Sequence, residues 1–347
     1  LLGRDPRQIN GLFQALQPYV GYSGSGAETR GRSAIDLALH DLAGQASGLP
    51  IHQLLGGLSR PSIRVYNTCA GYRYVRSKPT QETANWGIGG AAEGPYEDLE
   101  GFLHNAGALA ESLLSEGITG MKIWPFDFAA ERTGGFDISA AELDRAIDPF
   151  RKIRAAVGNR IDIMCELHGL FSPPTAARIA QALEPFRPYW IEDPVRPDNL
   201  SGYAVVRRAT GSMITASETV GGLRDWSRLI ATGDISIVMP DLGWCGGLTE
   251  ARRIAALADA AGLPIAPHDC TGPLQFAASV HLVLSQPNAL IQEFVRAFYT
   301  GWYNEIAENL PEVRDGIVHP PSGPGLGTRL KPGTFERPDA NVQTSSL

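Results

Sequence analysis

The sequence lacks any run of about 18 apolar residues, the length that a membrane-spanning helix requires, and no signal-peptide pattern opens it. It also lacks basic clusters, since its net charge of -7 is spread along 347 residues. We therefore expect neither a membrane nor a nucleic-acid partner. The four cysteines form no Cys-x-x-Cys pair, which is typical of reduced, buried cysteines in a cytoplasmic protein. They are Cys69, Cys165, Cys245 and Cys270.

The composition indicates a globular protein with a large core, because hydrophobic residues make up 43% of the chain and charged residues 19%. Length alone admits either two domains or one large α/β barrel. The opening part reads as helical, and residues 32–48 place Ile35, Leu39 and Leu42 on one helix face. Gly48 and Pro50 then supply a helix stop.

From Ser62 onward, eight β-rich runs alternate with segments that mostly carry a helical pattern. Such alternation predicts a parallel sheet, and eight strands that close on themselves form a (β/α)8 barrel. A doubly wound sheet is the alternative, but no glycine-rich phosphate loop follows the first run, and polar residues end nearly every run. We therefore expect an α/β fold of the (β/α)8-barrel type. The eight runs are residues 63–72, 117–126, 161–169, 189–195, 213–220, 235–243, 263–270 and 289–295.

Three consecutive runs carry a glutamate near their ends, and 26 residues separate Glu166 from Glu192 and Glu192 from Glu218. One strand–helix repeat apart, they are expected at matching heights on neighbouring strands. Three facing carboxylates would raise one another's pKa unless a cation neutralises them. Oxygen ligands without a local cysteine favour Mg²⁺ over zinc. A single glutamate could instead pair with a nearby lysine or arginine, but the regular repeat favours a metal site.

Other ionisable residues end the remaining runs. Asp241 could hold Nδ1–H of His268 and leave Nε2 free as a base, although His268 alone could equally be a buried histidine bound to a carbonyl. Lys122 could hold a substrate carboxylate or enolate oxygen, its pKa lowered by neighbouring cations, or form a salt bridge at the rim. Glu293 could hydrogen-bond the reacting group or form an ion pair. The remaining histidines are interpreted as structural or solvated: His40, His52, His104, His281 and His319.

This set of residues suits removal of a proton from the carbon next to a carboxylate, where a divalent cation stabilises the resulting enediolate. His268 would take that proton. His168 follows Glu166 by two residues, so the two side chains share one face of a strand. If His168 protonates a departing β-hydroxyl, water leaves and a 2-keto acid forms. If a group instead returns a proton to the opposite face, the product is the epimer.

The ordered set Glu166, Glu192, Glu218, Asp241, His268 and Glu293 resembles the mandelate racemase subgroup of the enolase superfamily. The phrases AIDLALHDLAGQASGLPIHQLLGG, WIEDP and MPDLGWCGG are similar to that subgroup, from about residue 30 to residue 330. The resemblance implies a barrel with an α+β capping domain, whose opening part is missing upstream of Leu1, and one Mg²⁺ per subunit. It also implies three regions: 1–60 as the remainder of the capping domain, 61–315 as the barrel, and 316–347 returning to the cap.

The second run departs from many members of the subgroup, which carry Lys-x-Lys where this chain has Lys122-Ile123-Trp124. The second lysine base is thus absent, while Glu166-Leu167-His168 resembles the sugar-acid dehydratases. The resemblance therefore implies a Mg²⁺-dependent sugar-acid dehydratase with His168 as general acid. An epimerase or cycloisomerase is the alternative, and a barrel that only binds or scaffolds is a third. We also expect a homo-oligomer, and substrate contacts from Tyr72, Arg73 and Trp124.

Overall fold

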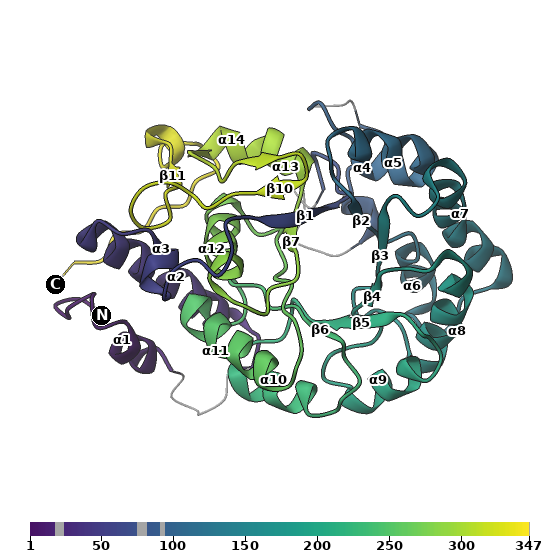
Figure 1. The fold of residues 1–347 in the computed structure, drawn as a ribbon, viewed down its shortest axis with the longest axis horizontal. Helices are drawn as coiled ribbons and strands as arrows, with labels where there is room; N and C mark the ends of the chain where they lie inside the picture. The colour runs from purple at the N-terminus through teal and green to yellow at the C-terminus, as the bar shows by residue number, and fades with distance from the viewer. Residues whose placement is uncertain (18–23, 75–81, 91–93, 347) are drawn as a thin grey trace.

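The computed structural model describes residues 1–17, 24–74, 82–90 and 94–346. Its strands form a ring with helices on the outside, as Figure 1 shows, so the expected barrel-type α/β fold is confirmed. The strands run in the order β6-β5-β4-β3-β2-β1, and β7 pairs in parallel with β1. Their bounds are β1 (Ile63–Thr68), β2 (Gly120–Ile123), β3 (Asp162–Glu166), β4 (Trp190–Glu192), β5 (Met213–Ala216), β6 (Ile237–Val238) and β7 (Gln292–Phe294).

The seventh expected strand, residues 263–270, is reduced to isolated bridges. Ile265 bridges Val238 of β6 on one side and Ala289, just before β7, on the other. Pro264 and Pro267 have no backbone N–H to donate, so a regular ladder cannot continue through them. The ring therefore passes from β6 to β7 through single-residue bridges, and the other seven expected strands are regular.

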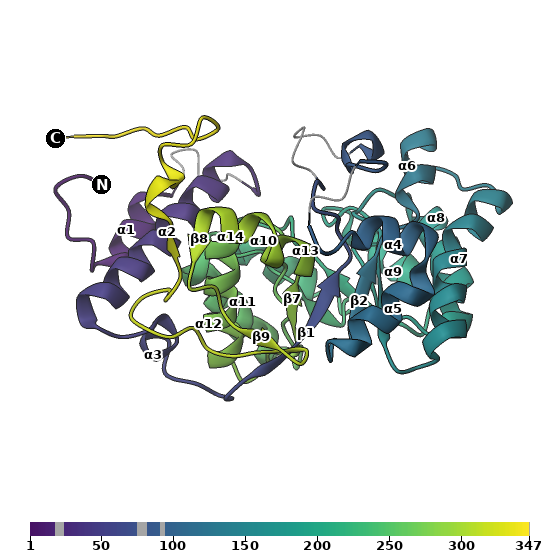
Figure 2. The same cartoon turned by 90° about the horizontal axis from the view of Figure 1, so that it is seen from above.

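Helices cover the outside of the ring (Figures 1 and 2). Where they follow a strand they carry the chain back to the start of the next one, which keeps neighbouring strands parallel. The helices from β1 onward are α4 (Asp98–His104), α5 (Ala106–Ser115), α6 (Asp127–Thr133), α7 (Ala140–Val157), α8 (Pro173–Leu183), α9 (Leu200–Arg207), α10 (Leu223–Ile230), α11 (Gly247–Ala260), α12 (Pro273–Ser285), α13 (Arg296–Thr300) and α14 (Trp302–Ile306). Within the described ranges, no helix combines the length and apolar character needed to cross a bilayer.

The N-terminal region is helical, with α1 (Ile9–Ala15), α2 (Ala27–Ser47) and α3 (Ile51–Leu54). The helix expected over residues 32–48 lies within α2, but the face that carries Ile35, Leu39 and Leu42 is not its buried face, since Leu42 is 47% exposed. The buried face of α2 carries Arg32, Ser33 and Asp36 and packs against α11. Polar side chains are needed there because they accept hydrogen bonds from backbone N–H groups at the start of α11.

The C-terminal segment runs back along the barrel to these helices. First β10 (Ile317–Val318) pairs antiparallel with β1 and with β9 (Val313–Arg314), while β11 (Arg329–Leu330) pairs with β8 (Ala307–Glu308). Between these pairings, the backbone of Gly325 exchanges hydrogen bonds with Leu49 and Ile51. The segment thus contacts both the barrel and the helical region, while the boundaries at residues 60 and 315 remain a prediction.

Candidate active site

Three buried or half-buried carboxylates converge at the carboxyl ends of β3, β4 and β5. Glu166 and Glu192 are partners in the β3–β4 register, as the 26-residue spacing predicts. Glu218 does not share that height, because Thr215 is the partner of Glu192 and Glu218 lies beyond the end of β5. Its side chain nevertheless completes the group, since one oxygen of each glutamate lies within 4.8 Å of the others.

The charges of this group call for a cation. Burial and the neighbouring charge of Glu166 raise the pKa of Glu192 well above its ordinary value. Oε2 of Glu166 is buried, and no hydrogen-bond donor among the described residues reaches it. The ammonium of Lys122 lies 3.6 Å from this oxygen, beyond hydrogen-bond distance, so a closer cation would stabilise the carboxylate further. These three glutamates therefore fit a divalent cation with oxygen ligands.

Lys122, on β2, lies inside the same network and is fully buried. Its Nζ lies 2.6 Å from Oε1 of Glu192, 3.0 Å from Oε1 of Glu293 and 3.6 Å from Oε2 of Glu166. Burial lowers the pKa of Lys122, but Glu192 and Glu293 outweigh burial, and the net pKa lies well above its ordinary value. The expectation of a lowered pKa applied to Lys122 beside a bound cation and remains a prediction, since the carboxylates by themselves raise the pKa. Lys122 therefore carries a positive charge that these carboxylates stabilise.

His268 and Asp241 form the expected pair. Nδ1 of His268 lies 2.7 Å from Oδ2 of Asp241, and their backbones form a parallel bridge. Nε2 was expected to be free, but in the structure it lies 3.0 Å from Oε2 of Glu218. Burial lowers the pKa of His268, yet Glu218, Glu293 and Asp241 together raise it well above its ordinary value. If the carboxylate of Glu218 bound another partner, Nε2 of His268 would be free to act as a base.

His168 has a carboxylate partner that the sequence analysis missed. Its Nδ1 lies 2.8 Å from Oδ2 of Asp127, the first residue of α6. Burial lowers the pKa of His168, but Asp127 and Glu166 outweigh burial and raise it to about 10. His168 therefore carries a proton at neutral pH, as a general acid must. The available signal was an acidic residue directly after the second expected strand.

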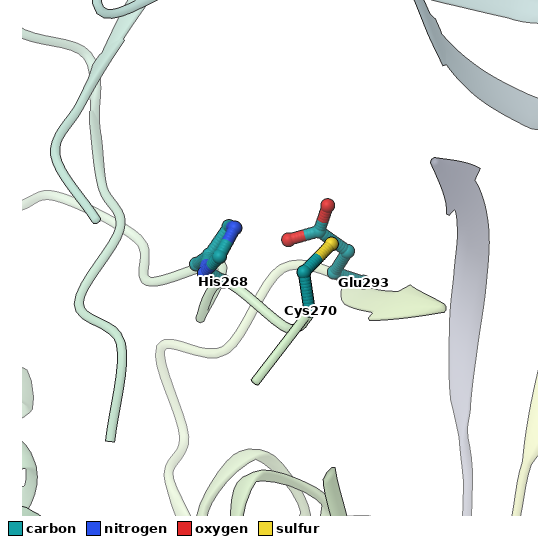
Figure 3. A group of neighbouring side chains, drawn as sticks. All are labelled: His268, Cys270 and Glu293. Carbon is teal, nitrogen blue, oxygen red and sulfur yellow. The ribbon is translucent and has the colours of Figure 1, made fainter. Parts of the chain in front are cut away.

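The end of β7 brings Glu293 beside His268. Oε1 of Glu293 accepts a hydrogen bond from the Thr68 hydroxyl, and Oε2 accepts one from the backbone N–H of Asp269 at 2.7 Å. Figure 3 shows the side chains of Glu293, His268 and Cys270 facing one another. The expectation that all four cysteines are buried is thus wrong for Cys270, which is half-buried beside this site.

A cavity of about 210 Å³ joins these groups, and His168 and His268 both line it. Trp124 is buried on its wall, in edge contact with His168, which fits its predicted place near a substrate. Trp244, which the sequence analysis missed, lies against His268 with a ring separation of 5.7 Å. The guanidinium of Arg30, from α2, lies 4.0 Å from the centre of the Trp244 ring, so the helical region reaches the site.

Two predicted substrate contacts lie elsewhere. Arg73 is exposed and is not among the residues that line the cavity. Tyr72 is buried and donates a hydrogen bond to Glu305 of α14. Tyr74, two residues further on, lines the cavity instead. A substrate role for Arg73 or Tyr72 remains a prediction.

Two family descriptions match the chain. Residues 105–334 match "Enolase C-terminal domain-like", and residues 1–56 match "Mandelate racemase / muconate lactonizing enzyme, N-terminal domain". The chain belongs to the mandelate racemase and muconate lactonizing enzyme family of the enolase superfamily. The expected relationship is therefore confirmed.

Curated relatives and solved structures agree with this assignment. The chain is 32% identical to D-galactonate dehydratase of Ralstonia nicotianae and to that of Pectobacterium atrosepticum, over 95% of this chain and 79% of each relative. Those relatives are hydro-lyases by name, which supports the expectation of an enzyme. A mandelate racemase subgroup enolase from Agrobacterium tumefaciens is 46% identical, with a TM-score of 0.84, over 97% of this chain and 82% of that one. An enolase protein from Sargasso Sea sequencing is 42% identical, with a TM-score of 0.86, over 100% and 85%.

Proposed function

We propose that this protein is a Mg²⁺-dependent dehydratase of a sugar acid, which expels the β-hydroxyl to form a 2-keto-3-deoxy acid. One observation carries the proposal: His168 and His268, each paired with its own carboxylate, line one cavity together with Glu218, a member of the glutamate triad. The dehydratase names of the curated relatives support the same reaction class.

The proposed steps assign one task to each side chain. His268 takes the proton from the carbon next to the carboxylate, and the electron pair of that C–H bond moves into an enediolate. His168 then gives its proton to the departing β-hydroxyl, so that water leaves and an enol remains, which tautomerises to the 2-keto acid. Lys122 contributes positive charge beside the substrate carboxylate. A divalent cation held by Glu166, Glu192 and Glu218 would stabilise the enediolate charge and neutralise the carboxylate that now raises the pKa of His268.

The first experiment is a screen of acid sugars in the presence of Mg²⁺, with 2-keto acid detected by semicarbazide. We expect product from at least one aldonate or uronic-acid-derived hydroxy acid. An epimer or lactone isomer without any 2-keto product would instead establish the alternative, an epimerase or cycloisomerase. That second candidate would use the same two histidines, His168 and His268, as proton carriers on opposite faces of the substrate.

Replacing His168 separates the two proton transfers. In His168→Asn, we expect dehydration to fall by about 10³-fold, within the range for loss of a general acid. Exchange of the α-proton with D2O, followed by NMR, should remain within about threefold, because His268 is unchanged. His319→Asn is the matched control, since His319 is exposed on the C-terminal segment. Parallel loss of exchange and dehydration would contradict this division of roles.

The metal ligands can be tested by measuring Mg²⁺ binding directly, without an activity assay. Calorimetry should show one Mg²⁺ per chain, and Glu218→Gln should weaken that binding by more than about tenfold, because even outer-shell substitutions cost about 10- to 100-fold. Glu312→Gln is the control, since Glu312 lies on the surface, paired with Arg314. Unchanged Mg²⁺ affinity in Glu218→Gln would remove Glu218 from the ligand set.

A further inference from the structure

His268, Cys270 and Glu293 form a second group of possible metal ligands beside the glutamate triad (Figure 3). One ligand atom of each side chain lies within 4.8 Å of the ligand atoms of the other two. This group offers an imidazole nitrogen, a sulfur and a carboxylate oxygen, whereas the triad offers oxygen alone. Sulfur and imidazole ligands suit Zn²⁺, while an all-oxygen set suits Mg²⁺. The two groups therefore differ in the cation that they favour.

The imidazole of His268 is already oriented in the way that zinc-binding histidines are. Nδ1 lies 2.7 Å from Oδ2 of Asp241, so Nε2 is the ring nitrogen left to bind a cation. A carboxylate on the other ring nitrogen orients a ligating histidine and makes it a stronger ligand. Nε2 lies 3.0 Å from Oε2 of Glu218, which belongs to the triad. Once Glu218 serves the triad, Nε2 is available to the second group.

The other two ligands keep the capacity to bind. Oε2 of Glu293 accepts a hydrogen bond from the backbone N–H of Asp269, which leaves a second lone pair on this oxygen. Cys270 is half-buried and lies in irregular backbone before α12. Ligand atoms around a tetrahedral zinc lie about 3.5 Å apart, so a contraction of about 1 Å would complete the site. A side chain on irregular backbone can move by that amount.

Two adjoining cavities give a cation access to this group. His268 and Cys270 line the catalytic cavity, and Cys270 also lines a neighbouring cavity of about 420 Å³. Glu293 lines neither cavity, so a cation reaches its carboxylate by passing between the other two side chains. Three protein ligands around zinc leave a fourth position for water on the side of the cavity.

We propose that His268, Cys270 and Glu293 form an inhibitory Zn²⁺ site, separate from the glutamate triad. The thiol of Cys270 releases its proton to solvent as the zinc–sulfur bond forms, and Nε2 of His268 gives its lone pair to the cation. His268 then has no lone pair with which to accept a proton from a substrate, so Zn²⁺ stops the reaction without displacing Mg²⁺. Zinc binding does not depend on the proposed function, whereas the inhibition rests on it through the role of His268.

The binding test uses Cd²⁺, because cadmium–thiolate bonds absorb in the ultraviolet. The full chain is titrated with Cd²⁺ in excess Mg²⁺, and we expect one equivalent to bind per chain with a cadmium–thiolate band. In Cys270→Ser the band should disappear, and calorimetry in excess Mg²⁺ should show Zn²⁺ binding weakened by at least about 100-fold. The same band in Cys270→Ser, or no band in the parent, overturns the proposal.

Cys245→Ser is the matched control for this test. Cys245 is buried, its thiol contacts the carbonyl of Gly247, and it belongs to neither group of possible metal ligands. A serine hydroxyl can donate to the same carbonyl. The band should therefore persist in Cys245→Ser, and thermal unfolding checks that both variants fold. Loss of the band in Cys245→Ser with Cys270 intact would overturn the assignment to Cys270.

The inhibition test compares the rate of each protein with and without Zn²⁺. With saturating Mg²⁺ and an acid that the screen identifies, Zn²⁺ should stop exchange of the α-proton with D2O in the parent. A further increase in Mg²⁺ of about tenfold should change the Zn²⁺ concentration for half-inhibition by less than about twofold, because the two cations occupy different sites. Cys270→Ser should require at least about 100-fold more Zn²⁺. Relief by Mg²⁺, or equal sensitivity of Cys270→Ser, would place Zn²⁺ in the triad and overturn the inhibitory site.

The outcomes separate the zinc site from the proposed function. A Cys270-dependent cadmium band in a protein that releases no 2-keto acid from any acid sugar supports the metal site and overturns the dehydratase. Release of 2-keto acid by a protein without that band supports the dehydratase and overturns the zinc site.

Discussion

At the scale of single residues, Asp127 determines how His168 is oriented. The hydrogen bond between them fixes Nδ1 and leaves Nε2 as the ring nitrogen available to a substrate. In Asp127→Asn we expect the rate of dehydration to fall by about 10²-fold while α-proton exchange at His268 is retained. The measurement pairs the semicarbazide assay with NMR exchange. Asp198→Asn is the control, because Asp198 is an exposed carboxylate paired with Arg196. Equal loss of both rates would show that Asp127 acts on the fold rather than on His168.

The charged residues at the strand ends could be predicted from the sequence, because the position of each strand end follows from its apolar run. Glu166, Glu192 and His268 each follow an apolar run, and the carboxyl ends of barrel strands meet at one face. Asp127 and Trp244 could not be found in this way. Asp127 begins a helix, and Trp244 lies in a turn, so neither belongs to a strand whose periodicity would place its side chain. Their proximity to the two histidines depends on the paths of loops, which no short-range pattern specifies.

At the scale of elements, the polar contact between α2 and α11 explains why the apolar residues that predict α2 do not form its buried face. Apolar spacing indicates a helix but not which neighbour covers each face. Oδ2 of Asp36 accepts a hydrogen bond of 2.9 Å from the backbone N–H of Thr249, in the first turn of α11. That N–H has no partner within the helix, so a carboxylate there also benefits from the helix dipole.

Replacing Asp36 tests this contact. Asp36→Ala leaves the buried N–H of Thr249 without an acceptor, and we expect the free energy of unfolding to fall by about 1–3 kcal/mol. Urea unfolding followed by circular dichroism measures the change. Asp259→Ala, on the exposed side of α11, is the control and should stay within about 0.5 kcal/mol. A loss in Asp36→Ala no larger than that of the control would show that the contact adds nothing to stability.

The barrel itself illustrates the limit of prediction at this scale. Seven of the eight expected runs form strands, because each carries enough apolar residues to be buried on both faces. The run at 263–270 holds two prolines and keeps its position in the ring through isolated bridges at Ile265 and His268. Its place was predictable from the order of runs, whereas its irregular backbone follows from the prolines. The same irregular run carries His268 and Cys270 into the site.

At the scale of the whole molecule, a buried histidine pair joins the helical region, the barrel and the C-terminal segment. Nδ1 of His281, on α12, lies 3.0 Å from Nδ1 of His52, on α3, and accepts a hydrogen bond from the backbone N–H of His52. Nε2 of His281 then donates to the carbonyl of Leu326. The ring of His281 must be neutral for this arrangement, because a proton on Nδ1 of His281 would face the donors of His52.

This junction makes stability depend on pH. Burial lowers the pKa of His281 to about 4 from an ordinary value of 6.5, and burial also lowers that of His52. The unfolded chain therefore binds a proton at higher pH than the folded chain does. The stability that the neutral His281 contributes is complete above pH 6.5 and is lost as the pH falls from there toward 4. For His281 the loss amounts to about 2 kcal/mol at pH 5. Asp41, whose Oδ1 accepts from the N–H of Leu326, is the carboxylate next to this junction.

The variant His281→Gln should remove much of that dependence, because glutamine can accept from His52 and donate to Leu326 but binds no proton. Urea unfolding at pH 7.5 and pH 5 should show a smaller fall in unfolding free energy for the variant than for the parent, by about 2 kcal/mol. His319→Gln is the control, since its exposed side chain should leave the fall unchanged. An equal fall in His281→Gln and the parent would mean that the junction tolerates a protonated His281. In that case the acid sensitivity of the fold would have to arise from the carboxylates, whose protonation below pH 5 acts in the same direction.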